Sequence, residues 1–251
     1  MGAAGHTEGF LGGKLRLFQL ARGHRAGTDA ALLAACVPAT AAGPGVDVGA
    51  GVGPVGLAAL RRAPALTMTM AEVDPAAAAL LRANIKVNAL EARATVAECD
   101  VLQPAARRAA DLHDNAAALV LTNPPFYEAG AVRASPDAGR ARAHVAGESG
   151  AQGWMRASLA LLGKDGLFVA IHRPQALHDL LEGAAGRIGA LAIMPVHARA
   201  EEAAIRILLA GRKGSRAPLR LLPPLVLHDA QGAFTARAQA LHNGEAGLEL
   251  A

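Results

Sequence analysis

The residues Asn123-Pro124-Pro125-Phe126 combine groups suited to binding a planar amino group. The side-chain carbonyl of Asn123 and the backbone carbonyl of Pro124 can accept the two hydrogens of an amino group on a purine or an amide. Consecutive prolines fix φ and remove competing N–H donors, so they would hold both carbonyls rigidly. Phe126 can stack on the planar group, as side chains do in pockets for extruded bases. The alternative interpretation is an ordinary proline-rich turn.

A second group of candidate residues is the glycine-rich segment that contains Asp47, Gly49, Gly51 and Gly53. The overlapping stretch 51–56 also matches the dinucleotide pattern GxGxxG, so a nicotinamide or flavin enzyme is a rival interpretation. A pyrophosphate needs the positive end of a helix and no nearby carboxylate. A sulfonium cofactor that carries an ammonium group tolerates Asp47. The order acidic-x-Gly-x-Gly-x-Gly therefore favours S-adenosylmethionine, and it resembles motif I of the class I methyltransferases.

Two further acids follow apolar runs at the expected places. Glu72 lies 25 residues after Asp47 and can accept hydrogen bonds from both ribose hydroxyls, close to the spacing of about 20 residues in nucleotide-binding folds. Asp100 is placed to accept the adenine amino group of the cofactor. Single acids at strand ends are common as helix caps, which is what we expect of Asp74 before a proline. Three acids in this order predict a bound S-adenosylmethionine.

The elements that position these residues are predicted from short apolar runs alternating with longer helical segments. The pattern predicts an α/β fold, a Rossmann-like, doubly wound, seven-stranded sheet whose last strand is antiparallel. A long loop is expected over 123–150. Ligands of such sheets lie at the carboxyl ends of the strands, where the candidate residues fall. The strands are expected at 46–49, 66–72, 95–98, 117–122, 166–171, 190–195 and 203–210, and the helices at 29–37, 54–62, 75–88, 152–162 and 174–183.

Composition limits the classes of protein that fit. The chain has 251 residues, 52% hydrophobic and 18% charged, which is typical of a globular domain and not of a disordered chain. The two cysteines, Cys36 and Cys99, have no CxxC spacing, so neither a disulfide framework nor a zinc site is expected, and a reducing cytoplasm fits. We expect no metal and no membrane span, because no apolar run reaches 18 residues.

The net charge of +4 permits contact with nucleic acid without requiring it. Trp154, the single tryptophan, is expected to anchor the core or a loop. The histidines, His172 among them, lack ligand spacing and are expected in solvent or as caps. Basic residues gather in three clusters, which are Lys14, Arg16, Arg22 and Arg25, then Arg133, Arg140 and Arg142, then Arg212, Lys213, Arg216 and Arg220.

A resemblance to a known family extends over nearly the whole chain. The stretches 7–13 (TEGFLGG), 23–29 (GHRAGTD), 212–215 (RKGS) and 224–228 (PLVLH), together with the motifs above, resemble the bacterial tRNA adenine-N6 methyltransferases that modify a valine tRNA. The resemblance implies that Gly27, Thr28 and Asp29 lie by the methionine end of the cofactor. It also implies that residues 123–126 hold the target adenine.

Other activities share the Asn-Pro-Pro core and stay open. RNA guanine-N2 methyltransferases also carry Phe at the fourth position, and the same core serves enzymes that methylate protein glutamine. A third alternative is an RNA-binding scaffold that keeps the fold without turnover. We expect a basic N-terminal extension (1–27) that contacts RNA and a methyltransferase domain (28–251), with tRNA as partner. The chain is expected to be a monomer or a weak homodimer.

Overall fold

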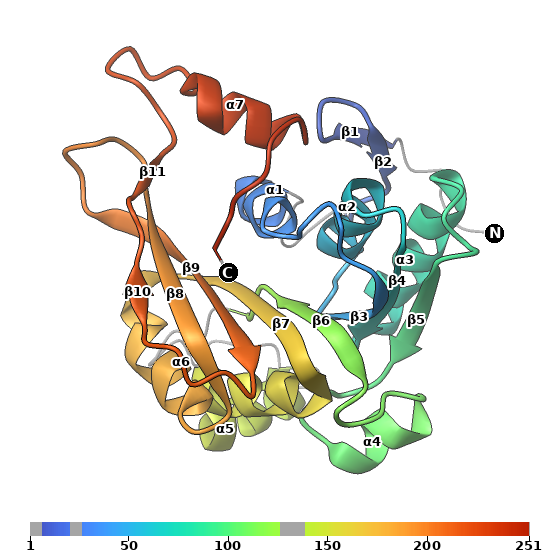
Figure 1. The fold of residues 1–251 in the computed structure, drawn as a ribbon. Coiled ribbons are helices and arrows are strands. Elements are labelled where there is room, and N and C mark those ends of the chain that lie inside the picture. The colour runs from blue at the N-terminus through green and yellow to red at the C-terminus, as the bar shows by residue number, and fades with distance from the viewer. Residues whose placement is uncertain (1–6, 21–26, 126–138, 251) are drawn as a thin grey trace.

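The computed structural model describes residues 7–20, 27–125 and 139–250, the last range with side chains from residue 150 onward. Figure 1 shows a central twisted sheet with helices on both faces. The strands of the sheet are β3 (Gly43–Val48), β4 (Leu66–Glu72), β5 (Ala94–Glu98), β6 (Ala117–Thr122), β7 (Leu162–His172), β8 (Ile188–His197), β9 (Ala204–Lys213), β10 (Arg220–Leu221) and β11 (Leu225–Val226).

The order of the sheet is β10-β8-β9-β7-β6-β3-β4-β5, with β11 also paired to β8. Strands β3 to β7 run parallel, whereas β9 is antiparallel to both β7 and β8. The predicted doubly wound sheet is therefore confirmed, and β9, which corresponds to the predicted seventh strand, is antiparallel as expected. The described sheet has nine strands and not seven, because the two-residue strands β10 and β11 extend the edge beyond β8. Strands this short leave no periodic signal in the sequence.

Two layers of helices cover the sheet (Figure 1). One face carries α1 (Thr28–Ala35), α2 (Pro54–Arg62) and α3 (Pro75–Val87). The other carries α4 (Pro104–Ala109), α5 (Gly139–Leu161) and α6 (Leu177–Ala184), the last preceded by a 3-10 turn at Pro174–Ala176. Each layer closes its own cluster of buried apolar residues, and Leu, Ala and Val dominate both. A last helix, α7 (Ala236–His242), lies beside α1.

The N-terminal hairpin is joined to the fold through its backbone. Strands β1 (Glu8–Phe10) and β2 (Leu15–Leu17) pair antiparallel, and Leu15 and Leu17 are fully buried in the same cluster as α1 to α3. Two buried amides, Asn84 on α3 and Asn88 at its C-terminal cap, bond the hairpin backbone as a neighbouring strand would. Asn88 pairs with the N–H and C=O of Arg16, and Asn84 pairs with those of Phe18. The hairpin therefore packs with the fold, and the RNA contact expected of residues 1–27 stays a prediction.

One expectation about the chain between residues 100 and 161 was wrong, and another lacked bounds. The predicted loop over 123–150 is helical from Gly139, since α5 begins there and is bent at Gly150, whose φ is 45°. Helices were expected between all of the first six strands, but no bounds were predicted for the one at α4. Alanine-rich segments blur the apolar period, so the sequence carried little signal for either feature. The strands at 66–72 and 117–122 and the helix at 54–62 have the predicted bounds.

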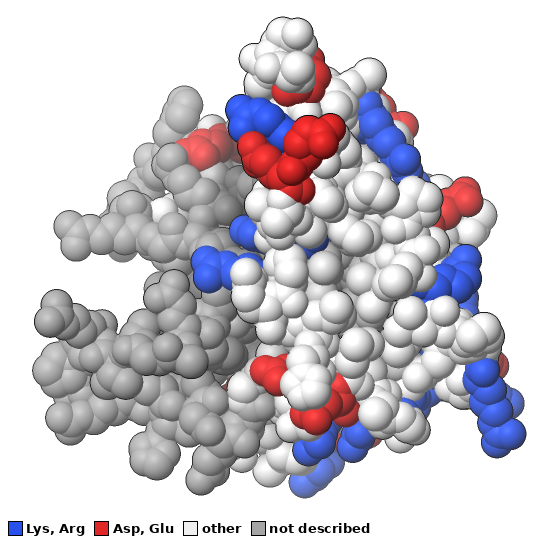
Figure 2. All heavy atoms as spheres, turned by 90° about the vertical axis from the view of Figure 1, so that its left-hand side faces the viewer, with Lys and Arg blue, Asp and Glu red and all other residues white. Residues whose placement is uncertain are grey.

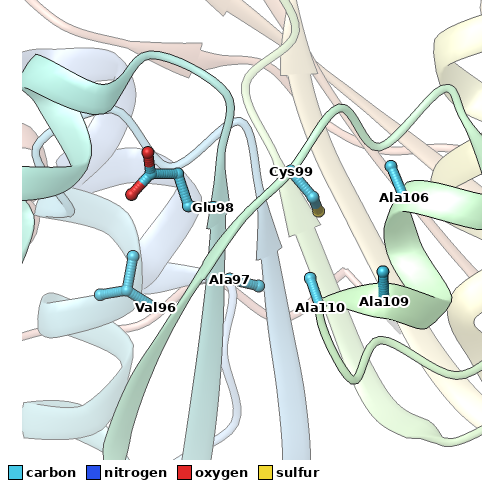
Figure 3. Close-up of a pocket in the computed structure, with 7 residues that line it drawn as sticks. All are labelled: Val96, Ala97, Glu98, Cys99, Ala106, Ala109 and Ala110. Carbon is cyan, nitrogen blue, oxygen red and sulfur yellow. The ribbon is translucent and has the colours of Figure 1, made fainter.

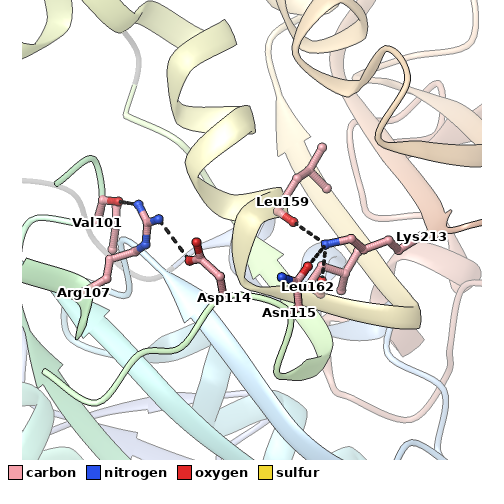
Figure 4. Close-up of polar contacts among 7 residues, drawn as sticks. All are labelled: Val101, Arg107, Asp114, Asn115, Leu159, Leu162 and Lys213. Carbon is pink, nitrogen blue, oxygen red and sulfur yellow. Dashed lines mark hydrogen bonds and ion pairs between the residues drawn. The ribbon is translucent and has the colours of Figure 1, made fainter. Parts of the chain in front are cut away.

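Polar contacts around the residues before β6 connect α4 and the end of α5 to the sheet (Figure 4). Arg107 on α4 donates to Val101 O at 2.8 Å and to Asp114 Oδ1 at 3.0 Å. Lys213 at the end of β9 donates to Asn115 Oδ1 at 2.6 Å and to Leu162 O at 2.5 Å. The Lys213 bonds fix the amino ends of β6 and β7, whereas the Arg107 bonds join the segment after β5 to the segment before β6. None of the helices that the structure describes is long and apolar enough to cross a membrane.

Candidate functional site

The loop between β3 and α2 is shaped by three glycines in left-handed conformations. The φ angles of Gly49, Gly51 and Gly53 are 74°, 57° and 91°, which disfavour any other residue. A Cβ on Gly53 would clash with a methyl of Leu81, and one on Gly49 would lie 2.8 Å from the ring of Trp154. At Gly51, no heavy atom of the described residues lies within 4 Å of that position. The middle of the loop therefore faces open space, where a ligand can lie against backbone.

Asp47, at the end of β3, supports this loop from below. Its side chain is 1% exposed and its Oδ2 accepts the N–H of Gly56 at 2.9 Å, in the first turn of α2. Burial raises the pKa of Asp47 to about 7, and repulsion from Glu72 adds to the effect while the Gly56 N–H opposes it. The carboxyl group is thus half protonated near neutral pH and serves as a buried brace between strand and helix.

Glu72 joins the glycine loop to the next strand. Its Oε2 accepts the N–H of Gly51 at 2.7 Å, and its Oε1 accepts the N–H of Asp74 at 2.8 Å. Asp74 in turn caps α3 by accepting the N–H of Ala76 at 2.9 Å, as the sequence predicted. Two backbone donors therefore hold the Glu72 carboxylate beside the open side of Gly51.

Asp100 follows β5 and completes a row of acids. Asp100 is partly buried and lies four residues before the first residue of α4. Its Oδ1 accepts the N–H of Leu102 at 2.9 Å. Because β3, β4 and β5 are parallel neighbours in the sheet, Asp47, Glu72 and Asp100 lie along one carboxyl edge. The predicted grouping of these three acids at one edge is what the topology produces.

Asn123 follows β6, the neighbour of β3 on the other side. Val48 and Thr122 are register partners, so Gly49 and Asn123 are the next residues on two adjacent strands. The Asn123 side-chain oxygen Oδ1 is buried and has no hydrogen-bond partner among the residues that the structure describes. Pro124 is buried and Pro125 exposed, while Phe126 lies outside the described residues. A buried carbonyl without a donor is costly, by about 1–3 kcal/mol, so this oxygen is suited to receive a donor from a ligand.

Comparison with known proteins bears on this arrangement. Residues 24–139 match the model of the methyltransferase small domain. A tRNA1(Val) (adenine(37)-N6)-methyltransferase of Aeromonas hydrophila is 31% identical over 216 residues, which is 85% of this chain and 86% of that protein. The chain belongs to this family of methyltransferases.

Other matches cover less of the relative or show the fold. The relative of the same name from Shewanella amazonensis is 34% identical over 123 residues, so the matched part of the chain spans about half of it (49%). A crystal structure described as a predicted O-methyltransferase from Agrobacterium tumefaciens is 31% identical, with a TM-score of 0.74 over 88% of this chain and 98% of that one. The T. thermophilus 16S rRNA N2 methyltransferase, solved with AdoMet and guanosine, is 21% identical with a TM-score of 0.54 over 82% of this chain and 49% of that one.

Gly27, Thr28 and Asp29 lie at the start of α1. Gly27 has extended backbone before α1, and its carbonyl accepts the N–H groups of Ala30 and Ala31. The Thr28 hydroxyl contacts His242 Nε2 at 2.9 Å, and Asp29 forms an ion pair with Arg206 at 2.8 Å. These contacts bind the start of α1 to the C-terminal half, so the role of the three residues beside the cofactor stays a prediction.

The burial of two polar residues was not predicted from the sequence. Thr122, which was not singled out, is fully buried and accepts the indole N–H of Trp154 at 2.8 Å. Trp154 is therefore the loop anchor that was expected. His172, expected in solvent or as a cap, is only 6% exposed, and its Nδ1 accepts the N–H of Arg173. Burial lowers the pKa of His172.

Three members of the C-terminal basic cluster bond atoms of the chain itself. Arg212 donates to Asp165 O and Arg220 to Leu250 O, and Lys213 makes the contacts drawn in Figure 4. On the face seen in Figure 2, Lys and Arg lie mainly at the margins and partly beside acids, around a largely uncharged middle. Arg22, Arg25 and Arg133 lie outside the described residues, and the side chains of Arg140 and Arg142 are not described.

Two further features of the described residues carry groups that could bind or react. A hollow of about 380 Å³ between β5 and α4 is lined by small side chains and by Glu98 and Cys99 (Figure 3). Burial raises the pKa of the Cys99 thiol, which makes it a poor nucleophile. On α6, the exposed side chains of His178, Asp179 and Glu182 offer ligand atoms within 4.8 Å of one another. Exposed groups of this kind are common without an ion, so neither feature is assigned.

Proposed function

We propose that this chain transfers a methyl group from S-adenosylmethionine to the exocyclic N6 of an adenine in tRNA. The observation that carries the proposal is the buried, unpartnered Oδ1 of Asn123 at the strand end next to the glycine loop. An amino group on a purine has a delocalised lone pair and two hydrogens. An acceptor held at a fixed place can orient that group, and alignment is a large part of the catalysis such a reaction needs.

The residues of the donor half fit S-adenosylmethionine. The open side of Gly51 gives room for the cofactor against the backbone of the loop. Glu72 would accept hydrogen bonds from the ribose hydroxyls, since each carboxylate oxygen keeps acceptor capacity beyond its one backbone donor. Asp100 would accept from the adenine amino group, and Asp47 would place partial negative charge below the loop. When bound, the cofactor supplies a methyl group on a sulfonium, which is already activated for transfer.

The acceptor half fits a planar amino group better than a hydroxyl. Asn123 Oδ1 would accept one hydrogen of the amine and the Pro124 carbonyl the other, leaving the nitrogen lone pair directed at the donor half. Pro124 and Pro125 have no N–H to compete for these acceptors. Phe126 is proposed to stack on the base. The reaction needs no strong base and no metal, because the donor is activated and the methylated amine loses its proton readily to water.

We further propose tRNA as the partner, a cytoplasmic location and a monomer or weak homodimer as the working state. Cys36 and Cys99 are buried free thiols, which suits a reducing compartment. The names of the relatives support tRNA as the substrate. Light scattering on the full chain, with and without tRNA, measures the oligomeric state directly.

The test is methyl transfer from labelled S-adenosylmethionine to unmodified total tRNA and, separately, to a protein extract. Nucleoside digestion and mass spectrometry identify the product, with the Asn123→Ala variant as control. N6-methyladenosine that is lost in the variant supports the proposal. Methylguanosine, a methylated ribose oxygen, or label only on protein would replace the substrate while keeping the cofactor.

A scaffold without turnover is separated by cofactor binding. A ligand that binds the folded state raises the melting temperature by mass action. We expect millimolar S-adenosylmethionine to stabilise the chain, and the Glu72→Gln variant to respond less. No thermal shift together with no transfer would favour an RNA-binding scaffold.

A further inference from the structure

The indole of Trp154 contacts the starts of both halves of the site. Its Nε1 donates to Thr122 Oγ1 at 2.8 Å, and that hydroxyl donates to the carbonyl of Val48 at 2.9 Å. The six-membered part of the ring lies so close to Gly49 that a Cβ there would be 2.8 Å from Cζ2. One side chain of α5 therefore bridges the strand end before Asn123 and the strand end before the glycine loop.

The bridge leaves little freedom to either strand end. Thr122 is fully buried, and its hydroxyl is oriented by accepting from one group and donating to another. Val48 and Thr122 are the last register pair between β3 and β6. The two residues that follow, Gly49 and Asn123, inherit their separation from this pair. The bond from Thr122 to Val48 is buried and the bond from Trp154 to Thr122 is part-buried. Hydrogen bonds shielded from water are electrostatically stronger than those at the surface, so the bridge resists opening.

We propose that Trp154 and Thr122 form one positioning unit, which fixes the acceptor amide of Asn123 relative to the glycine loop that holds the methyl donor. This inference rests on the proposed function. Neither residue touches the reacting atoms; both act through the backbone of residues 48–49 and 122–123. Errors of about 1 Å in the placement of reacting groups can cost about 100-fold in rate. Loss of the bridge should therefore lower kcat more than cofactor affinity.

The experiment compares variants that break the bridge in different ways. Thr122→Val removes the hydroxyl with little change of shape, and Trp154→Phe keeps an aromatic ring near Gly49 but removes the N–H. Thr122→Ser keeps the hydroxyl and is the conservative rescue. Ser158→Ala is the matched control, because its buried hydroxyl bonds the carbonyl of Trp154 in the same helix without reaching either strand end.

We expect kcat for tRNA methylation to fall by at least about 10-fold in Thr122→Val and in Trp154→Phe. The dissociation constant of S-adenosylhomocysteine, measured by calorimetry, should change less than about threefold. Thr122→Ser and Ser158→Ala should keep kcat near that of the unmodified chain. The double variant should lose no more than the worse single variant, because both substitutions break one interaction.

A readout independent of turnover comes from the tryptophan itself. Trp154 is the only tryptophan in the chain, so its emission reports one environment. Thr122→Val should shift that emission because the indole N–H loses its acceptor, whereas Ser158→Ala should not. Additive losses in the double variant, or unchanged kcat in both single variants with a shifted emission, would overturn the positioning role. Absence of methyl transfer by the unmodified chain would instead overturn the proposed function, while the emission result still tests whether the bridge exists.

Discussion

The two halves of the site differ in how their polar groups are satisfied. In the donor half, the loop around Gly51 is held by bonds within the chain, from Asp47 to Gly56 and from Glu72 to Gly51. In the acceptor half, Asn123 presents a buried oxygen to which no group in the described part of the chain donates, and the two residues that follow cannot donate from their backbone. The donor half is thus complete as a folded unit, and the acceptor half is incomplete without a ligand.

This contrast indicates how each half contributes to function. A self-supported loop can bind a small cofactor with little rearrangement, which lowers the cost of binding. An unsatisfied acceptor adds nothing to folding, yet it gains a hydrogen bond when an amino group arrives. Hydrogen bonds within the chain therefore stabilise the donor half, whereas the acceptor half contains an unfavourable buried group, as functional sites commonly do.

The substitution expected to have the largest effect on this difference between the halves is Asn123→Ala. We expect kcat to fall by about 100- to 1,000-fold, the loss typical of removing one oriented polar group from an active site. The melting temperature should stay unchanged or rise, because the substitution removes a buried oxygen that has no partner. Steady-state methylation and a thermal melt of the same preparation measure both effects.

The control for this substitution is Thr122→Ser, which leaves the amide in place and keeps the neighbouring hydroxyl bonded. A marked destabilisation by Asn123→Ala would contradict the view that its side-chain oxygen is unsatisfied in the folded chain. Activity close to that of the unmodified protein would remove Asn123 from the acceptor role.

The difference between the halves also explains what the sequence could predict. The strand ends that carry Glu72 and Asn123 were located because their apolar runs are continuous and sharply bounded. Parallel strand order then brings such ends to one edge whatever the details of packing. The helix at 54–62 was predicted in full because a proline at its first position marks its start.

Features that depend on distant contacts were not predictable. The hairpin β1–β2 is too short to be stable alone. It is held by Asn84 and Asn88, which lie 66 and 72 residues further along the chain than the hairpin residues that they bond. The bond from Asp47 to Gly56 and the bridge through Trp154 need side-chain placement that periodicity cannot supply. The alanine-rich helix α4 and the short helix α7 lack the apolar contrast on which a prediction rests.

A second substitution tests how the N-terminal hairpin supports the donor half. Asn84 is fully buried and bonds Phe18 on one side and the carbonyl of Val52, in the glycine loop, on the other. Asn84→Ala should lower the free energy of unfolding by roughly 3 kcal/mol, because several buried backbone groups lose their partner at about 1–3 kcal/mol each. It should also weaken cofactor binding, because Val52 is no longer restrained.

Asn88→Ala is the matched control for this prediction. Asn88 bonds the same hairpin through Arg16 and the carbonyl of Asn84, and none of its bonds goes to the glycine loop. Denaturant unfolding should show similar losses of stability for both variants, while calorimetry with S-adenosylhomocysteine should show weaker binding only for Asn84→Ala. Equal cofactor affinity in the two variants would count against a link between the hairpin and the loop.

A smaller effect should follow Gly51→Ala. The φ of 57° is strained for alanine, at a cost of about 1–2 kcal/mol. The added Cβ enters the open space beside the loop, so cofactor affinity should fall by about 10-fold, equivalent to about 1.4 kcal/mol. Gly53→Ala should instead lose more stability, because its Cβ meets Leu81. If Gly51→Ala bound the cofactor normally, the open side of Gly51 would not be the cofactor site.

The stability of the chain should also depend on pH, through the donor half. The pKa of Asp47 is raised from 3.8 to about 7 in the folded chain, chiefly by burial, so the folded state keeps a proton that the unfolded state has lost. Stability should therefore decrease as the pH rises from about 4 to about 7, with a limiting slope of about 1.4 kcal/mol per pH unit, and level off above that range. Asp47→Asn should remove this slope and still accept the N–H of Gly56 through its amide oxygen. Asp100→Asn is the control, since Asp100 makes the same kind of backbone bond from a less buried place. Urea unfolding at a series of pH values checks the difference between the unmodified chain and each variant. Parallel curves for the unmodified chain and Asp47→Asn would show that the buried brace does not hold a proton.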